Sequence, residues 1–253
     1  MNEASALVLT YHSIGEDRPP LGISPQRLEA QLDLLEQAGF RPVSLPALVT
    51  SLEQGRVLPE PSFCMTFDDG YRDFETHALP ILARRRIPAT LFVTASADRA
   101  ALAGGVGHPL VDLEALPGLP DRGVTVGAHS ISHVDLTRVD DATLEIELAE
   151  GRAILERYLG DRVEHFAYPF GRLDRRVRAA AGRFYRSACT TQLECVPPGQ
   201  DPLAIPRIDA HYLRSPLLRL LLRRRRPQAY LGFRRRLRRL RGSEPTLDLP
   251  ASG

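Results

Sequence analysis

The chain has 253 residues, contains neither lysine nor tryptophan, and carries a formal net charge of +2 at pH 7. Hydrophobic residues make up 43% and charged residues 25%, which is typical of a soluble globular protein and argues against a disordered or fibrous chain. The three cysteines form no C-x-x-C pair, so neither a disulfide framework nor a thiolate zinc site is indicated. The absence of lysine excludes Schiff-base catalysis.

Apolar, β-rich runs alternate with helical patterns, which predicts an α/β fold of βα repeats, as a sheet or a barrel. Ser24 as N-cap, Pro25 at the first helical position and Gly39 just past the end delimit the first helix. The expected strands cover residues 6–11, 62–67, 89–94, 125–128, 164–167 and 187–191. The expected helices cover residues 25–38, 74–86, 141–158 and 175–184, with a mostly irregular stretch at 97–122.

Charge divides the chain into an acidic body and a basic end. Residues 214–253 hold twelve arginines against two acids, a local balance of +10, so residues 1–213 sum to −8. We expect a catalytic domain at 1–213, a basic amphipathic segment at 214–242 that is broken at Pro227, and a disordered tail at 243–253.

The leucines and arginines of residues 214–241 alternate in a way that suits an anionic bilayer surface, which predicts peripheral membrane contact. Because leucines are interleaved with the arginines, nucleic acid is a less favoured partner than a membrane surface. A solvated segment without a partner is the remaining alternative. The opening Met-Asn-Glu-Ala-Ser lacks a basic signal-peptide region, and no apolar run approaches the roughly 20 residues that cross a bilayer. These features predict a cytoplasmic protein, peripheral on the inner membrane face.

Two adjacent carboxylates follow the strand expected at 62–67. Asp68 and Asp69 precede Gly70 at the carboxyl end of that strand, where α/β folds place their active sites. Because successive side chains on extended backbone diverge, one carboxylate can bind a metal while the other accepts a proton. Asp and Gly also favour turns, so a plain turn is the alternative.

Two histidines follow the strand expected at 125–128. His129 and His133 are four residues apart and would meet on one face if the segment turned helically. Neutral imidazoles are the commonest metal ligands, and two of them with one carboxylate leave coordination positions open, as in a hydrolytic metal site. A pair of structural histidines is the alternative for this motif taken alone.

The order of these motifs resembles that of a known family. Residues 66–70 (TFDDG) and 129–133 (HSISH) closely resemble the first two motifs of NodB-type polysaccharide deacetylases, carbohydrate esterase family 4. Residues 166–171 (FAYPFG) resemble the third motif, and residues 11–14 (YHSI) resemble the start of the branch that includes poly-N-acetylglucosamine deacetylases. The resemblance extends over roughly residues 6–210.

The resemblance implies a deformed (β/α) barrel and a divalent metal bound by Asp69, His129 and His133. Zinc is the expected metal, with cobalt or nickel as alternatives. The resemblance also makes Asp68 the general base for attack by metal-bound water on an acetamide carbonyl. It assigns Tyr168 to the site, where its backbone N–H would stabilise the oxyanion and the residue would contact the substrate; a packed aromatic side chain is the alternative for its phenol.

The general acid is marked less clearly. Members of the family supply a histidine late in the domain, and His211 is the late histidine of this chain, so it is the candidate acid. Arg207 is expected either to orient a carboxylate or to bind substrate, with a surface arginine as the alternative. His12, at the end of the first strand, is expected to line the same pocket and bind substrate, with a structural histidine as the alternative.

The sequence therefore predicts a metal-dependent hydrolase that removes N-acetyl groups from an amino sugar in a polysaccharide, an oligosaccharide or a lipid-linked glycan. Two alternatives stay open. One is a non-catalytic carbohydrate-binding module of the same fold, against which three metal ligands and a base argue. The other is the same fold acting on another amide or on an ester acetyl group.

Overall fold

The computed structural model describes residues 6–18, 21–56, 58–59, 61–96 and 109–240. Its core is an eight-stranded parallel sheet in the order β10-β1-β5-β6-β7-β8-β9, with β4 paired to β5 outside this path. A separate parallel pair joins the two-residue strands β2 and β3. The strands are β1 (Leu7–Tyr11), β2 (Ser13–Ile14), β3 (Gly22–Ile23), β4 (Arg41–Pro42), β5 (Ser62–Phe67), β6 (Ala89–Val93), β7 (Val124–Ala128), β8 (His165–Ala167), β9 (Ser187–Cys189) and β10 (Ile208–Asp209).

A short segment after β9 brings the two edges of the sheet together. Ile205 makes a parallel bridge to Cys189 in β9, and three residues later Ile208 pairs with Leu9 in β1. Because one segment contacts both edge strands, the sheet curls into a deformed barrel. This closure confirms the fold class that the sequence predicted, and it carries Arg207 into the barrel wall.

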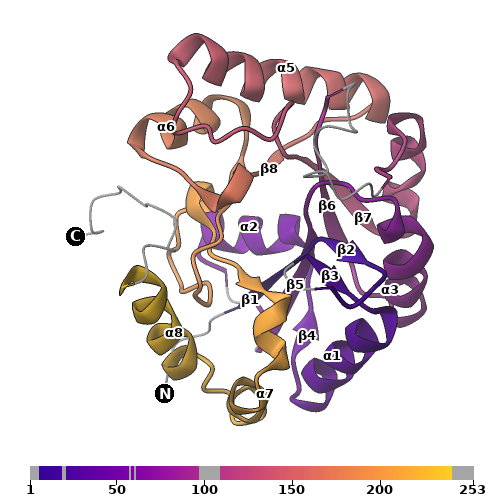
Figure 1. Cartoon of the computed structure of the whole chain (residues 1–253), viewed down its shortest axis with the longest axis vertical. Helices are drawn as coiled ribbons and strands as arrows, with labels where there is room; N and C mark the ends of the chain where they lie inside the picture. Colours follow the sequence, from indigo (N-terminus) through magenta and orange to yellow (C-terminus); the bar gives the residue numbers. More distant parts are fainter. Residues whose placement is uncertain (1–5, 19–20, 57, 60, 97–108, 241–253) are drawn as a thin grey trace.

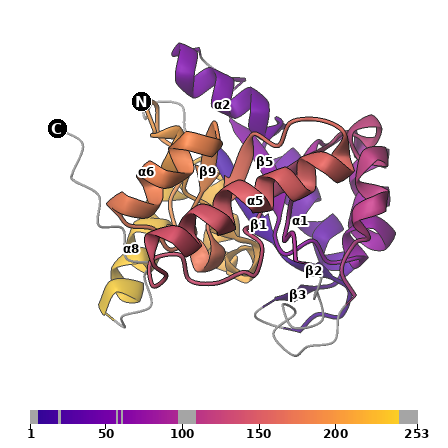
Figure 2. The ribbon, with the colours of Figure 1, turned by 90° about the horizontal axis from the view of Figure 1, so that it is seen from above.

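Helices surround the sheet, with α5 and α6 side by side in one group and α1 and α7 together in another (Figures 1 and 2). Ser24 and Asp140 cap α1 and α5, each accepting a backbone N–H from three residues further on. The helices are α1 (Pro25–Gln37), α2 (Leu45–Gln54), the π-helical η1 (Phe74–Ala78), α3 (Leu79–Arg85), α5 (Asp141–Leu159), α6 (Arg175–Phe184), α7 (Pro216–Arg223) and α8 (Gln228–Leu240). Short 3-10 turns are η2 (Leu113–Gly118), η3 (Pro120–Arg122), η4 (Pro169–Gly171), η5 (Pro202–Ala204) and η6 (Ala210–Arg214).

The sequence analysis did not anticipate α2. Its boundary signals are nevertheless ordinary, since the Ser44 hydroxyl accepts the backbone N–H of Ala47 and Gly55 ends the helix with a φ of 61°. The strands β2, β3 and β4 were also not expected. Each has two residues, which is too short to produce a periodic pattern.

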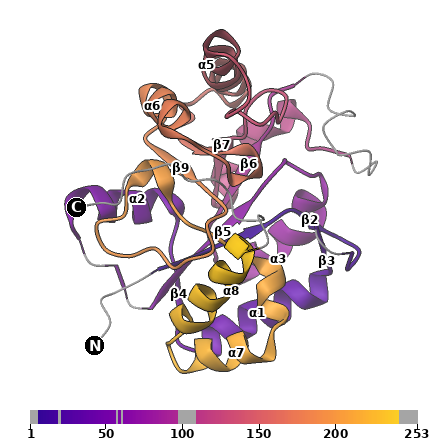
Figure 3. The same ribbon diagram turned by 60° about the vertical axis from the view of Figure 1, so that its left-hand side comes forward.

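The basic segment forms two helices separated at Pro227, and both fold back onto the body. Leu218 and Leu222 of α7 and Leu231 of α8 are buried, and α7 packs against α1 (Figure 3). The tail expected at 243–253 lies outside the described residues. Within the described residues, none of the helices combines the length and apolar character needed to span a bilayer.

Candidate active site

The two aspartates leave β5 in different directions. Asp69 and Gly70 both adopt left-handed backbone conformations, with φ values of 70° and 72°, so the chain turns sharply directly after Asp68. A non-glycine residue in this region is strained and is held there by its surroundings. The turn buries the Asp68 carboxylate in the barrel and leaves Asp69 partly exposed, facing the loop that follows β7.

The two histidines meet in a tight loop rather than through the helical turn that was one way of bringing them together. His129 directly follows β7 and its backbone N–H donates to Val93 at the end of β6, 2.9 Å away. Ser130 and His133 then take left-handed conformations, with φ values of 64° and 55°. The loop brings the two imidazole rings to a centroid separation of 4.8 Å. The sequence thus identified the pair, but the local backbone differs.

Asp69, His129 and His133 form one donor set. Each histidine Nε2 lies 3.4 Å from the Asp69 Oδ1, and one donor atom from each of the three residues lies within 4.8 Å of the others. The His129 Nδ1 lies 2.7 Å from the carbonyl oxygen of Ala167 and must donate its proton to it, which leaves the Nε2 lone pair facing Asp69. Two imidazoles and a carboxylate with open positions fit a divalent transition metal.

Burial and neighbouring charges shift the pKa values of the three donor residues in different directions. Burial lowers the pKa of His133 to about 4, with a further contribution from the charge of His129. Burial would also lower the pKa of His129, but the hydrogen bond and charge of Asp69 outweigh it and raise that pKa. Burial would raise the pKa of Asp69, yet the neighbouring histidines hold it well below its usual range. A cation binding here meets a carboxylate and at least one neutral imidazole at neutral pH.

Asp68 is held by a buried arginine from the segment that closes the barrel. Arg207 donates from Nη1 and Nη2 to the two Asp68 carboxylate oxygens, both at 2.7 Å. It also donates to the hydroxyl of Thr66 and to the carbonyl of Thr190. Burial would raise the pKa of Asp68, but the Arg207 charge, followed by that of His129, keeps it below its ordinary value. Asp68 is therefore ionised and fixed in orientation.

The Arg207 side chain is enclosed by protein. Its side chain is 0% exposed, and its guanidinium donors are directed to protein oxygens. The substrate-binding role expected for Arg207 is therefore wrong, and its geometry matches the alternative of orienting a carboxylate.

The hydrogen bonds of Tyr168 also differ from those expected. Its backbone N–H donates to the carbonyl of Cys189 at 3.0 Å, and its hydroxyl donates to the carbonyl of Leu203 at 3.0 Å. The side chain is fully buried. Both donors are thus used within the protein, which leaves none for an oxyanion or a substrate.

The residue that the sequence analysis missed is Phe170, two positions later in the same motif. Its backbone is left-handed, with a φ of 59°, and its exposed ring packs edge-on against His133 with centroids 4.7 Å apart. Among the described residues its backbone N–H makes no hydrogen bond. The Pro-Phe-Gly run in the third motif was the available signal, but the sequence does not show which N–H stays free.

The two remaining candidate histidines, His12 and His211, lie in different parts of the structure. His12 follows β1, is half-buried, and its charge acts on Asp68, Asp69 and His133. His211 lies in η6, where its backbone N–H donates to Asp209. The electrostatic contribution of His12 to the lowered pKa values of both aspartates favours His12 over His211 as the histidine next to the donor set.

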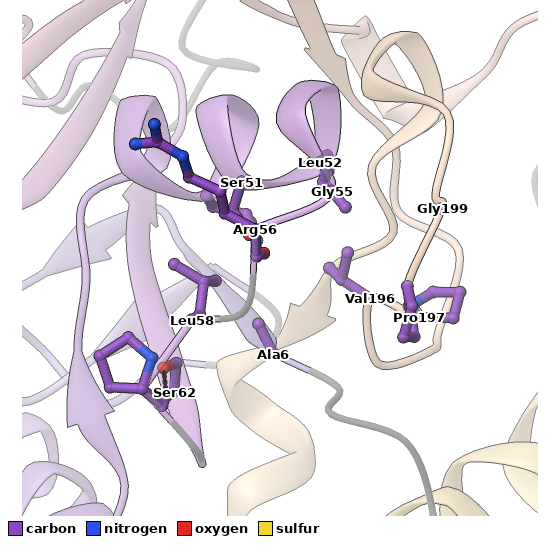
Figure 4. Close-up of a pocket in the computed structure, with 13 residues that line it drawn as sticks. Ala6, Ser51, Leu52, Gly55, Arg56, Leu58, Ser62, Val196, Pro197 and Gly199 are labelled. Atoms are coloured by element: carbon purple, nitrogen blue, oxygen red, sulfur yellow. Dashed lines mark hydrogen bonds between the residues drawn. The ribbon is translucent and has the colours of Figure 1, made fainter.

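A separate cavity of about 190 Å³ lies at the opposite end of the barrel. Ala6 and Ser62 border it at the amino ends of β1 and β5, and the end of α2 faces Val196 and Pro197 across it (Figure 4). Its lining is mostly apolar and includes no histidine or carboxylate among the described residues. Among the described residues, this cavity therefore offers no group that could bind a metal ion.

Comparisons with known proteins agree with this geometry. The family model described as polysaccharide deacetylase matches residues 55–185, just over half of the chain. The fold resembles the Streptococcus pyogenes deacetylase PplD in complex with acetate, at a TM-score of 0.72 and 22% identity over 82% of this chain and 93% of that chain. IcaB from Ammonifex degensii aligns at a TM-score of 0.70 and 25% identity, over 88% of this chain and 97% of that chain.

A shorter similarity links the chain to the poly-beta-1,6-N-acetyl-D-glucosamine N-deacetylase of Escherichia coli. The two are 30% identical over 86 residues, which are 33% of this chain and 13% of that protein. The region matched by the family model contains the aspartate pair, both histidines and Phe170. On this evidence the chain belongs to the NodB-type polysaccharide deacetylase family and is a deacetylating hydrolase.

Proposed function

We propose that this protein removes N-acetyl groups from an amino-sugar saccharide with the help of a divalent metal ion. The observation that carries the proposal is the pairing of two carboxylates in distinct states. Asp68 is buried and locked by Arg207, while Asp69 faces two imidazole nitrogens at 3.4 Å. This division supplies one group for proton transfer and another for metal binding.

Asp69, His129 and His133 would hold the metal, for which zinc is the first candidate and cobalt or nickel are alternatives. When bound, the ion supplies Lewis-acid chemistry that polarises the acetyl carbonyl and lowers the pKa of water. The ordered His129 tautomer supports this assignment, because the Ala167 carbonyl directs the Nε2 lone pair toward the set.

Asp68 accepts the proton of the attacking water. Its lowered pKa keeps it ionised at neutral pH, and the bidentate Arg207 contact keeps its carboxylate from rotating. The free N–H of Phe170 stabilises the oxyanion that forms as the carbonyl is attacked. His12, partly exposed beside both aspartates, replaces His211 as the proton donor to the leaving amine.

The proposed substrate is an N-acetylglucosamine-containing saccharide, supported by the similarity to the Escherichia coli deacetylase over 86 residues. We would incubate the protein with N-acetylglucosamine oligomers and with an O-acetylated polysaccharide, with zinc and after chelation, and measure released acetate. Zinc-dependent release from the oligomers is expected. Release only from the O-acetyl substrate would favour the ester alternative, and no release from either with oligosaccharide binding retained would favour the binding module.

We also propose that residues 214–241 contact an anionic membrane surface peripherally. Four of the six exposed large apolar side chains among the described residues belong to α7 and α8, so exposure of this kind is concentrated there: Leu217, Leu220, Phe233 and Leu240. Arg219, Arg223 and Arg236 are exposed beside them, with no carboxylate in ion-pair range among the described residues. Exposed apolar groups with unpaired cations suit a lipid interface, where a lipid-linked glycan would be within reach.

Sedimentation with vesicles tests this contact. The full chain should bind equimolar phosphatidylglycerol–phosphatidylcholine vesicles and not pure phosphatidylcholine. Replacing Arg219 and Arg223 by glutamine should weaken binding about fivefold per arginine, the equivalent of about 1 kcal/mol each. The matched control replaces the exposed Arg122 and Arg162 of the body and should bind normally. Equal loss in the control, or preferential binding to duplex DNA that vesicles do not displace, would contradict the proposal.

A further inference from the structure

The loop between the two histidines is bound by a buried carboxylate from α5. Glu147 accepts the backbone N–H of Ile131 at 2.8 Å and of Ser132 at 3.0 Å through Oε2, and its Oε1 accepts the Ser132 hydroxyl. The residue is only 6% exposed, and among the described residues no arginine pairs with it. A buried charge whose partners all come from one loop binds that loop strongly, since charge-assisted hydrogen bonds are the stronger kind.

The loop has a conformation that needs such a partner. Ser130 and His133 flank it in left-handed conformations, which cost energy for residues with a side chain. Two successive N–H groups, those of Ile131 and Ser132, point at one acceptor and form an anion-binding concavity. Left without an acceptor, these partly buried donors would destabilise the loop.

The opposite side of the loop is fixed by the segment that follows β6. Ala95 donates its N–H to the carbonyl of Ser130, and Ser96 donates to the carbonyl of Ile131, both at 3.0 Å. The loop's carbonyls therefore accept hydrogen bonds from the segment after β6, while its N–H groups donate to Glu147 of α5. Neither contact involves a histidine side chain, so both act on ring position through the backbone.

Gly151 allows α5 to come this close. It lies one helical turn after Glu147, and a Cβ added there would meet the Ile131 side chain at 3.2 Å and the Ile131 nitrogen at 3.4 Å. The helix backbone thus lies directly against the loop that Glu147 binds. Two positions on one face of α5 determine where the loop lies.

We propose that Glu147 is a positioning residue for the metal site: by binding the loop from Ser130 to Ser132, it holds His129 and His133 with their Nε2 atoms toward Asp69 before a metal arrives. The inference rests on the proposed metal-binding role of these three residues. Groups that hold a metal-ligating histidine in place typically account for 10- to 100-fold in metal affinity when removed. Glu147 acts in the same way but less directly, because it binds the backbone of the loop between the two histidines rather than a histidine side chain.

The test measures zinc affinity by chelator competition on the folded full-length protein, without substrate. Glu147→Ala should weaken zinc binding 10- to 100-fold, whereas Glu147→Gln, which keeps one carbonyl oxygen for the two N–H groups, should retain most of the affinity. The matched control is Glu150→Ala, an exposed glutamate on the same helix, which should bind zinc like the wild type. At saturating zinc, Glu147→Ala should lower kcat more than it raises KM.

A purely structural role would give a different result. In that case Glu147→Ala would lower Tm while zinc affinity, measured below the melting transition, stayed within twofold of the wild type, and the proposal would be wrong. Gly151→Ala adds a second variant that perturbs the same loop by crowding and leaves the hydrogen bonds of Glu147 intact, and it too should weaken zinc binding. A wild-type protein that binds no zinc would contradict both this inference and the metal site.

Discussion

The two ends of the barrel contain the same residue types in contrasting environments. At the carboxyl end, His129 and His133 share a site with two buried or half-buried carboxylates. At the amino end, the buried His165 contacts the hydroxyl of Ser187 at 2.8 Å, and an apolar cavity lies nearby at the start of the sheet. The comparison teaches that histidine burial alone does not make a site; the convergence of carboxylates does.

Strained backbone conformations are also concentrated at the carboxyl end of the barrel. Six non-glycine residues among the described ones have positive φ values, and four of them line the carboxyl-end site: Asp69, Ser130, His133 and Phe170. Strained conformations persist where the surrounding structure holds them, and they cluster at functional sites. The strained residues thus mark the same end of the barrel as the donor set.

The largest difference in activity should appear when one histidine at each end of the barrel is replaced by alanine. His133→Ala removes a metal ligand, so we expect acetate release to fall at least about a thousandfold, because the ion supplies several kcal/mol of stabilisation to the transition state. His165→Ala should leave metal content unchanged. Acetate assays and elemental analysis of the two purified proteins check the contrast, and loss of metal from the His165 variant would break it.

The second contrast compares one arginine from each end. Arg207→Met leaves the buried Asp68 carboxylate without its partner and should lower the free energy of unfolding by about 3–5 kcal/mol. Arg186 pairs with Glu53 at the amino end with both side chains about a third exposed, so Arg186→Met should cost only about 0–1 kcal/mol. Denaturant titration measures both, and equal losses would show that burial does not separate the two pairs.

The third prediction concerns pH. Burial, followed by the Arg186 charge, lowers the pKa of His165 to about 4, below its ordinary 6.5. In the unfolded chain this histidine takes up a proton below pH 6.5, whereas the folded protein resists it until about pH 4. Stability should therefore be full above pH 6.5 and fall by roughly 3 kcal/mol on acidification to pH 4.

His165→Gln should remove this part of the pH dependence, which urea titrations at a series of pH values would measure. If the free energy of unfolding of that variant depended on pH as it does in the wild type, other groups, those of the carboxyl end included, would cause the acid sensitivity.

The smallest effect is expected at the amino-end cavity. Leu52 borders it and is half-buried, so Leu52→Ala should lower the free energy of unfolding by about 1 kcal/mol. Zinc affinity and acetate release should not change. A change in either would mean that the two ends are energetically coupled.

Much of the fold followed from local patterns. The capping residues predicted α1, and the position of Asp68 and Asp69 after an apolar strand predicted the edge of the sheet where the site lies. The two-residue strands left no periodic signal, and α2 had capping signals that the sequence analysis did not use.

The site was predictable as a set of residue types, but not in its contacts. Arg207 and Asp68 are 139 residues apart, and their pairing depends on how the barrel closes. Tyr168 and Phe170 share one motif, and only the backbone geometry shows that the first N–H is used and the second is free. The loop joining the histidines looked helical by spacing, whereas its left-handed residues depend on Glu147 and the segment after β6.

The central claim is that Asp68 transfers protons and Asp69 binds the metal. The most direct measurement is zinc content together with acetate release for Asp68→Asn, which keeps the side-chain shape next to Arg207. We expect this variant to bind zinc like the wild type and to lose turnover by about a hundredfold or more. Wild-type turnover, or loss of zinc in parallel with activity, would contradict the division of roles between the two aspartates.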